Sequence, residues 1–288
     1  MKYGVIDVGT NTIRSVVYNG ELKVLAEMVA ESTILKYTEN GCLTEKGIGE
    51  LCSALKNAAE FFKNNSADAV NAFATSAMRD VKNFLSVKDA VFASCKIEIE
   101  LLSEYEEAMC DFTSVKLQTS DKVSGAAADI GGGSCQLMLC KNGELLYHCS
   151  EKLGVKRMYN RFGELTHENE SEVRSFIKES FSCVPFFSSD TLFVMGGTSK
   201  KIKKLTKKLL DSADLTPNTL NKCLELYYEK NQGYVELSST EINKIPYGIA
   251  IVDELCRLCD ADKISVLSGG VREGYVLRHI PVNQDKLP

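Results

Sequence analysis

The chain has 288 residues, of which 44% are hydrophobic and 25% charged, enough for one large or two medium globular domains. A net charge of −5 argues against a nucleic-acid-binding protein, and only three histidines, none in a motif, argue against histidine or zinc chemistry. The apolar runs are shorter than a membrane span, and we recognise no signal peptide after Met1. The spacing of the eleven cysteines is not typical of a disulfide-rich domain. We therefore expect a cytoplasmic protein with reduced thiols and no membrane partner.

The first half of the chain predicts strands joined by tight turns and followed by helices. Thr44 caps a predicted helix with apolar residues at 3.6-residue spacing, and Ser103 with Glu106 forms a capping box for a helix to about residue 118. The polar stretch 31–43 reads as a loop, and Asn19-Gly20 predicts a hairpin turn. Predicted strands cover residues 3–6, 13–18, 22–29, 70–74 and 97–102, and another helix covers about 83–94.

The second half repeats the opening pattern before it diverges. Asn142-Gly143 predicts a second hairpin turn, between strands 135–140 and 144–150. Further predicted strands cover 124–130, 192–195 and 264–267, and predicted helices cover segments of 156–180, about 218–228, 247–259 and 271–278. A lysine-rich helix follows Gly196-Gly197-Thr198.

Both halves contain a strand that ends in an acid and a glycine turn, at Asp7 and at Asp129. This internal repeat predicts two similar domains, 1–122 and 123–288, each an α/β unit with a mixed sheet flanked by helices. Consecutive N–H groups of such a turn bind anions, and the acid can hold a hydrated cation that bridges to phosphate. Ordinary hairpin turns also contain glycines, so a single turn is weak evidence. A cleft between the domains is the expected ligand site.

Six motifs, in one order along the chain, carry a resemblance to a known family. They are VIDVGTNTIRSVV at 5–17, ATSAMRD at 74–80, LLSEYEEA at 101–108, DIGGGSCQL at 129–137, MGGTSK at 195–200 and LSGGVREG at 267–274. In them the chain resembles the exopolyphosphatase/guanosine pentaphosphate phosphohydrolase (Ppx/GppA) family of the actin-like superfamily. The resemblance implies two ribonuclease H-like domains and Mg²⁺-dependent release of the terminal phosphate of polyphosphate or of the 5′ γ-phosphate of pppGpp.

The resemblance also implies roles for individual residues. Glu107 matches the family's catalytic base, and Asp7 and Asp129 match metal-binding positions. The implied phosphate-binding residues are Gly9, Thr10, Asn11, Thr12, Arg79, Gly131, Gly132, Gly133, Ser134, Gly196, Gly197 and Thr198. Gln136 stands where the family usually has glutamate, so this catalytic position can orient water but cannot act as a base. Glu104, where the family commonly has glycine, is a second departure.

Several features keep other interpretations open. Glu104, Glu106 and Glu107 all lie in the first turn of a predicted helix, where charge–dipole stabilisation alone would favour acids. Gln136 motivates an alternative function, a catalytically weak sensor of a phosphorylated ligand, whereas a phosphotransferase is disfavoured by the family motifs. Cys256 and Cys259 are expected to pack in a core rather than bind metal. A homodimer is an expectation from the family only.

The lysine-rich helix has two interpretations of its own. It carries Lys200, Lys201, Lys203, Lys204, Lys207 and Lys208. The plainer interpretation is a solvated helix face. The other is a basic track that guides polyphosphate or nucleotide phosphates, since local positive charge attracts anions despite a negative net charge.

Overall fold

The computed structural model describes residues 1–212, 214–230, 234 and 242–280, which form two compact units. One unit is Met1–Cys110 together with the chain from Val271 onward, and the other is Asp111–Gly270. This division differs from the expected domains 1–122 and 123–288, because residues 111–122 belong to the second unit and the C-terminal helix belongs to the first.

A five-stranded sheet of order β3-β2-β1-β6-β7 forms the centre of the first unit. The first three strands pair antiparallel, and β1, β6 and β7 pair in parallel. The strands are β1 (Tyr3–Val8), β2 (Thr12–Tyr18), β3 (Val24–Glu31), β6 (Ala69–Ala74) and β7 (Ile99–Leu101), with a small hairpin of β4 (Thr38–Glu39) and β5 (Cys42–Leu43). The helices are η1 (Leu35–Tyr37), α1 (Glu45–Asn64), α2 (Ser76–Arg79), α3 (Phe84–Cys95) and α12 (Val271–His279).

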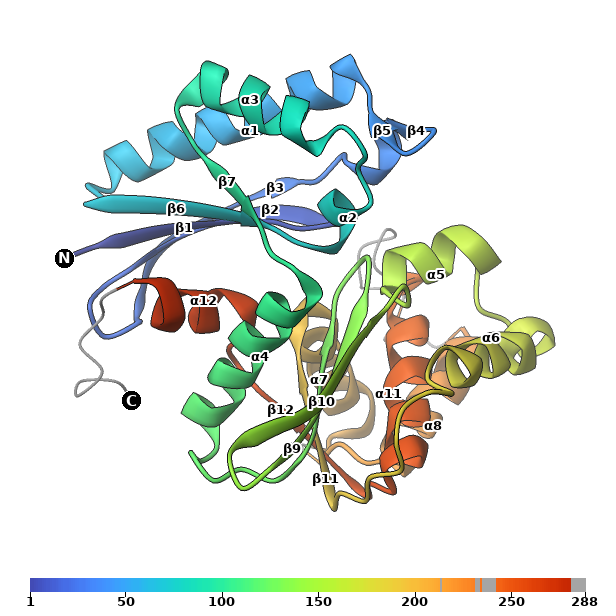
Figure 1. Ribbon diagram of the computed structural model, residues 1–288. Helices are drawn as coiled ribbons and strands as arrows, with labels where there is room; N and C mark the ends of the chain where they lie inside the picture. The colour runs from blue at the N-terminus through green and yellow to red at the C-terminus, as the bar shows by residue number, and fades with distance from the viewer. Residues whose placement is uncertain (213, 231–233, 235–241, 281–288) are drawn as a thin grey trace. The chain divides into compact units, whose positions relative to one another are not determined.

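Helices cover both faces of this first sheet, with α1 and α3 on one face and α12 on the other (Figure 1). Helix α12 places Val271, Tyr275 and Val276 in a core cluster with Val5 and Val16 of the sheet. Burial of these apolar side chains attaches α12 to the first unit. The repeat in the sequence contained no signal for this return.

The second unit contains a sheet of order β10-β9-β8-β11-β12, with the same pattern of antiparallel and parallel pairs. Its strands are β8 (Gly125–Ile130), β9 (Cys135–Lys141), β10 (Glu144–Glu151), β11 (Thr191–Met195) and β12 (Lys263–Val266). Its helices are α5 (Val155–Phe162), α6 (His167–Ser180), α7 (Gly196–Leu210), α8 (Pro217–Tyr228) and α11 (Ile245–Cys259). Helix α4 (Glu104–Gln118) begins in the first unit and ends in the second.

The shared strand order confirms the repeat and the predicted α/β fold with mixed sheets flanked by helices. The segment 31–43, predicted as a loop, instead contains the end of β3, η1 and the β4–β5 hairpin. These pieces are too short for hydrophobic periodicity to reveal them. Strand β3 also starts later than predicted, because Asn19 Oδ1 accepts from the N–H groups of Glu21 and Lys23 and keeps that segment in the turn.

Cys256 and Cys259 lie in the hydrophobic core of the second unit, as predicted. Burial raises the pKa of these thiols to about 12 and about 11, respectively, which disfavours the thiolates that bind metals. Over the described residues, no helix is long and apolar enough to cross a membrane.

Two glycines of α1 allow a matched test of its packing. A Cβ on Gly47 would lie 2.6 Å from Leu43 Cδ1 and 2.8 Å from Tyr37 Cβ, whereas one on Gly49 would meet nothing within 4 Å. We expect Gly47→Ala to lower the free energy of unfolding by about 1–3 kcal/mol through overpacking. Gly49→Ala should raise it by about 0.5–1 kcal/mol, because alanine is the better helix former. Equal melting temperatures for the two variants would contradict this packing.

Candidate active site

The two glycine turns are closed by the same backbone hydrogen bond. Gly9 N–H donates to Thr12 O at 3.1 Å in the first turn, and Gly131 N–H donates to Ser134 O at 3.0 Å in the second. The strand registers then place Asp7 opposite Arg14 and Asp129 opposite Gln136. The acid at the end of each first strand therefore has a fixed neighbour across the hairpin, a cation in one unit and an amide in the other.

Asp7 forms an ion pair that the sequence analysis did not identify. Arg272 of α12 donates from Nη1 to Asp7 Oδ2 at 2.9 Å. Burial raises the pKa of Asp7, an effect that the Arg272 guanidinium opposes. Burial also works against the charge of Arg272, but Asp7 and Glu273 outweigh it and raise the pKa of Arg272. The only sequence signal for Arg272 was its place in the motif LSGGVREG.

Glu107 and Arg79, both predicted site residues, meet in the first unit. Arg79 Nη1 lies 2.6 Å from Glu107 Oε2 and also donates to Leu102 O at 3.1 Å. Glu107 is only 5% exposed, so the pair is largely removed from water. Arg79 reaches it from α2, a single helical turn that directly follows β6.

The capping function near Glu107 belongs to its neighbour. Ser103 N–H donates to Glu106 Oε2 at 2.8 Å, and Glu106 N–H donates to Ser103 Oγ at 3.1 Å. The hydrogen bond from the Ser103 backbone lowers the pKa of Glu106. Helix capping thus accounts for Glu106, and the buried position of Glu107 needs another explanation.

The second turn is held by the start of α5. The N–H groups of Lys156 and Arg157 donate to Gly132 O at 3.0 and 3.2 Å, and Val155 N–H donates to Gly131 O at 3.1 Å. In a trans peptide the carbonyl and the following N–H point in opposite directions. The N–H groups of Gly132 and Gly133 therefore point away from α5, as an anion-binding turn requires.

Two glycines lie close to the carboxylate of Asp129. Gly196 has φ of +91°, and a Cβ there would lie 2.4 Å from Asp129 Oδ1. A Cβ on Gly270 would lie 4.0 Å from Asp129 Oδ2 and 3.9 Å from Asp111 Oδ1. Asp111, which is fully buried, was missed by the sequence analysis, although it follows Glu107 at the four-residue spacing of one helix face.

Gln136 is 2% exposed and donates from Nε2 to Ser134 Oγ at 3.0 Å. Because Ser134 Oγ accepts this hydrogen bond, its own O–H is directed elsewhere and can donate. The amide thus orients a residue of the second turn. A glutamate here would accept from the hydroxyl instead.

The remaining predicted residues lie in the same turns and at the start of α7. Thr10 is buried, Asn11 O accepts from Ser32 N–H at 2.9 Å, and Thr12 begins β2. Gly197 and Thr198 belong to the first turn of α7, directly after Gly196. Their phosphate-binding roles stay predictions.

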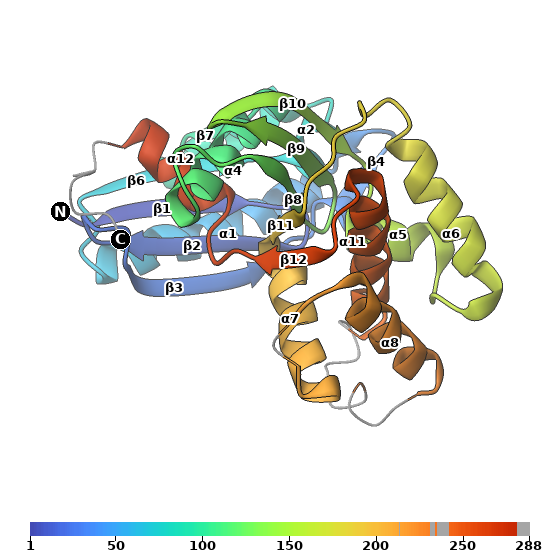
Figure 2. The same cartoon turned by 90° about the horizontal axis from the view of Figure 1, so that it is seen from below.

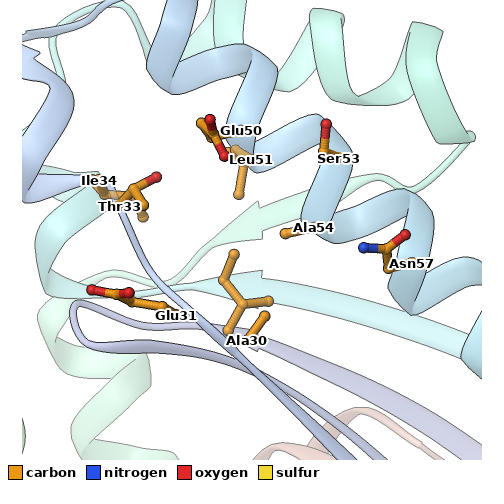
Figure 3. Close-up of a pocket in the computed structure, with 10 residues that line it drawn as sticks. Ala30, Glu31, Thr33, Ile34, Glu50, Leu51, Ser53, Ala54 and Asn57 are labelled. Carbon is orange, nitrogen blue, oxygen red and sulfur yellow. The ribbon is translucent and has the colours of Figure 1, made fainter.

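A separate pocket of about 220 Å³ lies in the first unit between α1 and strands β2 and β3 (Figure 3). Glu31 and Glu50 contribute carboxylates to its lining, with Ser53, Asn57 and apolar side chains, and none of the described lysines or arginines lines it. Two acids without a basic partner do not suit a phosphate ligand. None of the predicted site residues lines this pocket.

Comparison with known proteins identifies the family of this chain. The model of the Ppx/GppA phosphatase family matches residues 15–282. The protein called exopolyphosphatase 1 from Mycobacterium tuberculosis is 22% identical over 312 residues, covering 99% of this chain and 90% of the relative. A bifunctional 3-dehydroquinate synthase/phosphatase from Fusobacterium nucleatum is 25% identical and covers 93% of this chain, with 46% of its own length aligned.

Solved structures share the fold. The crystal structure of an exopolyphosphatase from Cytophaga hutchinsonii has a TM-score of 0.84 at 18% identity, covering 96% of this chain and 97% of its own. That of the Aquifex aeolicus Ppx/GppA family member has a TM-score of 0.81 at 22% identity, covering 97% of each chain.

The buried Arg79–Glu107 pair predicts an asymmetric effect of mutation on stability. Arg79→Met should lower the free energy of unfolding by about 3 kcal/mol, because Glu107 would stay buried without this partner. The double variant Arg79→Met/Glu107→Gln should recover part of the loss, since the second change removes the buried charge. Chemical denaturation measures both.

The pair of a half-buried Lys88 and an exposed Glu98, 2.8 Å apart, provides the control. Lys88→Met should change the free energy of unfolding much less than Arg79→Met, because water screens this pair. A double variant less stable than Arg79→Met would contradict the expected coupling.

Proposed function

Because this chain belongs to the Ppx/GppA phosphatase family, we propose that it is a phosphatase that releases the terminal phosphate of inorganic polyphosphate. The observation that carries the proposal is the second turn, which follows Asp129 in the chain and whose Gly132 and Gly133 N–H groups point away from α5. The 22% identical relative named exopolyphosphatase 1 supports polyphosphate as the substrate class.

Hydrolysis of a phosphoanhydride requires an oriented water and neutralisation of phosphate charge. In this proposal Glu107 accepts the proton from the attacking water, and Arg79, 2.6 Å away, fixes the orientation of its carboxylate. The N–H groups of Gly132 and Gly133 and the hydroxyl of Ser134 bind phosphate oxygens. Gln136 orients Ser134 through the 3.0 Å hydrogen bond from its amide.

Mg²⁺ is the proposed cofactor, and Asp129 is the residue that fits it best. Magnesium prefers one or two carboxylates, keeps several waters and bridges to substrate phosphates. Asp129 and Asp111 both approach Gly270, where a side chain is absent. Asp7 fits the ion less well, because the Arg272 guanidinium lies 2.9 Å from its carboxylate. Bound Mg²⁺ would neutralise charge on the phosphate oxygens.

Two related functions follow from the same residues. Hydrolysis of the 5′ γ-phosphate of pppGpp needs the same phosphate-binding groups and the same base. A catalytically weak sensor of a phosphorylated ligand is favoured by Gln136, which cannot accept a proton as glutamate can.

Phosphate release from long-chain polyphosphate, tripolyphosphate and pppGpp tests the base. Glu107→Gln should lower kcat by roughly 10²–10⁴-fold, the usual loss for a general base. Gln136→Glu should raise kcat if a second carboxylate at this position helps to activate water. A Glu107→Gln enzyme at full rate would refute the base assignment. A wild-type protein that binds these ligands tightly but releases no phosphate would favour the sensor.

The metal assignment has its own test. Chelation of divalent cations should abolish phosphate release, and Mg²⁺ should restore it. Asp129→Asn should raise the Mg²⁺ concentration needed for half-maximal activity by roughly tenfold or more, because it replaces a charged ligand by a neutral one. The exposed Asp262→Asn serves as the matched control. Equal Mg²⁺ dependence of the two variants would remove Asp129 from the site.

A further inference from the structure

Helix α7 packs beside α8 in the second unit (Figure 2) and has one buried face and one exposed face. Its buried residues are Ser199, Ile202, Leu205 and Thr206, and the helix packs against β8 and β11. The exposed side carries the lysine stripe, which we define as Lys200, Lys201, Lys203, Lys204, Lys207 and Lys208. All six of these lysines are exposed.

The spacing of the lysine stripe makes it linear. Steps of three and four residues place side chains on one side of a helix, one above the other at about 5.4 Å per turn. From Lys200 to Lys208 the stripe extends about 12 Å along the axis, at 1.5 Å per residue. A row of charges of this length suits an extended polyanion better than a compact one.

A solvated surface alone does not explain this composition. Helix α7 contains no aspartate or glutamate, so every charged neighbour at three- or four-residue spacing within it is another lysine. Such like-charge pairs destabilise a helix by a few tenths of a kcal/mol each. The helix dipole favours only the lysines in the last turn, Lys207 and Lys208. The net charge of the chain is −5, so this row of positive charges differs from the chain as a whole.

The same helix connects the lysine stripe to the second glycine turn. A Cβ on Gly196, its first residue, would lie 2.4 Å from Asp129 Oδ1. Lys200 follows four residues later, about 6 Å along the helix axis. The stripe therefore begins about one helical turn from the carboxylate that adjoins the proposed phosphate-binding turn, within one unit.

We propose that the lysine stripe binds the extended chain of linear polyphosphate whose terminal phosphate lies at the second turn. This inference rests on the proposed function for the identity of the ligand. Each phosphate residue of such a chain is anionic, so one chain can contact several lysines in succession. Tripolyphosphate and a nucleotide are too short to do so. The contribution of the stripe should therefore grow with chain length and fall as salt screens the charges.

The test replaces three lysines by glutamine, which removes the charge and keeps a polar, unbranched side chain of similar helix propensity. The stripe variant is Lys203→Gln/Lys204→Gln/Lys207→Gln. The control removes the same charge from exposed positions of α1, as Lys46→Gln/Lys56→Gln/Lys63→Gln. At low salt we expect the stripe variant to raise KM for long-chain polyphosphate roughly tenfold. Its kcat and its KM for tripolyphosphate should match those of the control.

Direct binding separates failure of this inference from failure of the proposed function. The affinity of Glu107→Gln protein for long-chain polyphosphate is measured by calorimetry, with and without the three stripe substitutions. A loss of affinity for long-chain polyphosphate only with the stripe substitutions supports binding by the lysine stripe, even if no substrate is hydrolysed. Three results would overturn the proposed role of the lysine stripe. They are an unchanged affinity for long-chain polyphosphate in the stripe variant, an equal loss of affinity for tripolyphosphate, and an equal loss of affinity in the α1 control. Weakened binding to single-stranded RNA but not to polyphosphate would assign the stripe to another partner.

Discussion

The backbone hydrogen bond that closes each glycine turn fixes the register of its hairpin and therefore the direction of the acid before the turn. Gly9 N–H to Thr12 O and Gly131 N–H to Ser134 O fix the register of two hairpins. A slip of one residue would turn Asp7 and Asp129 to the opposite face of their sheets. Close packing against backbone reinforces the second turn, because a Cβ on Gly154 would lie 2.2 Å from Gly132 C. Glycine at position 154 is thus a packing requirement of the second turn.

The two units share a sheet topology, but the residues around Asp7 and around Asp129 differ. In the first, Asp7 pairs with Arg272 and stands opposite Arg14, so two arginines act on its carboxylate. In the second, Asp129 stands opposite Gln136 and adjoins Gly196 and Gly270. Cations next to an acid oppose the binding of a divalent metal, whereas glycines leave space for one. This difference underlies our assignment of the metal to the second turn.

Local signals in the sequence predicted much of the fold. Hairpin dipeptides, the Ser103–Glu106 capping box and the repeated acid–glycine turn all act over a few residues, and the structure contains each of them. The Arg272–Asp7 pair joins residues 265 apart, and no periodicity encodes such a contact. Asp111 was missed for a related reason, since burial of an acid depends on what packs over its helix. Family motifs located Glu107, but only the hydrogen bonds separate its position from the capping role of Glu106.

The attachment of α12 to the first sheet has a consequence for how the chain folds during synthesis. Residues 111–270 form one uninterrupted unit, whereas the first unit draws core residues from both Val5 and Val276. A ribosome therefore releases all of the second unit before the last apolar residues of the first are available. Until α12 emerges, the Val5–Val16 side of the first sheet lacks its cover, and exposed apolar surface of this kind is prone to aggregation. The unit that begins first along the chain is completed last.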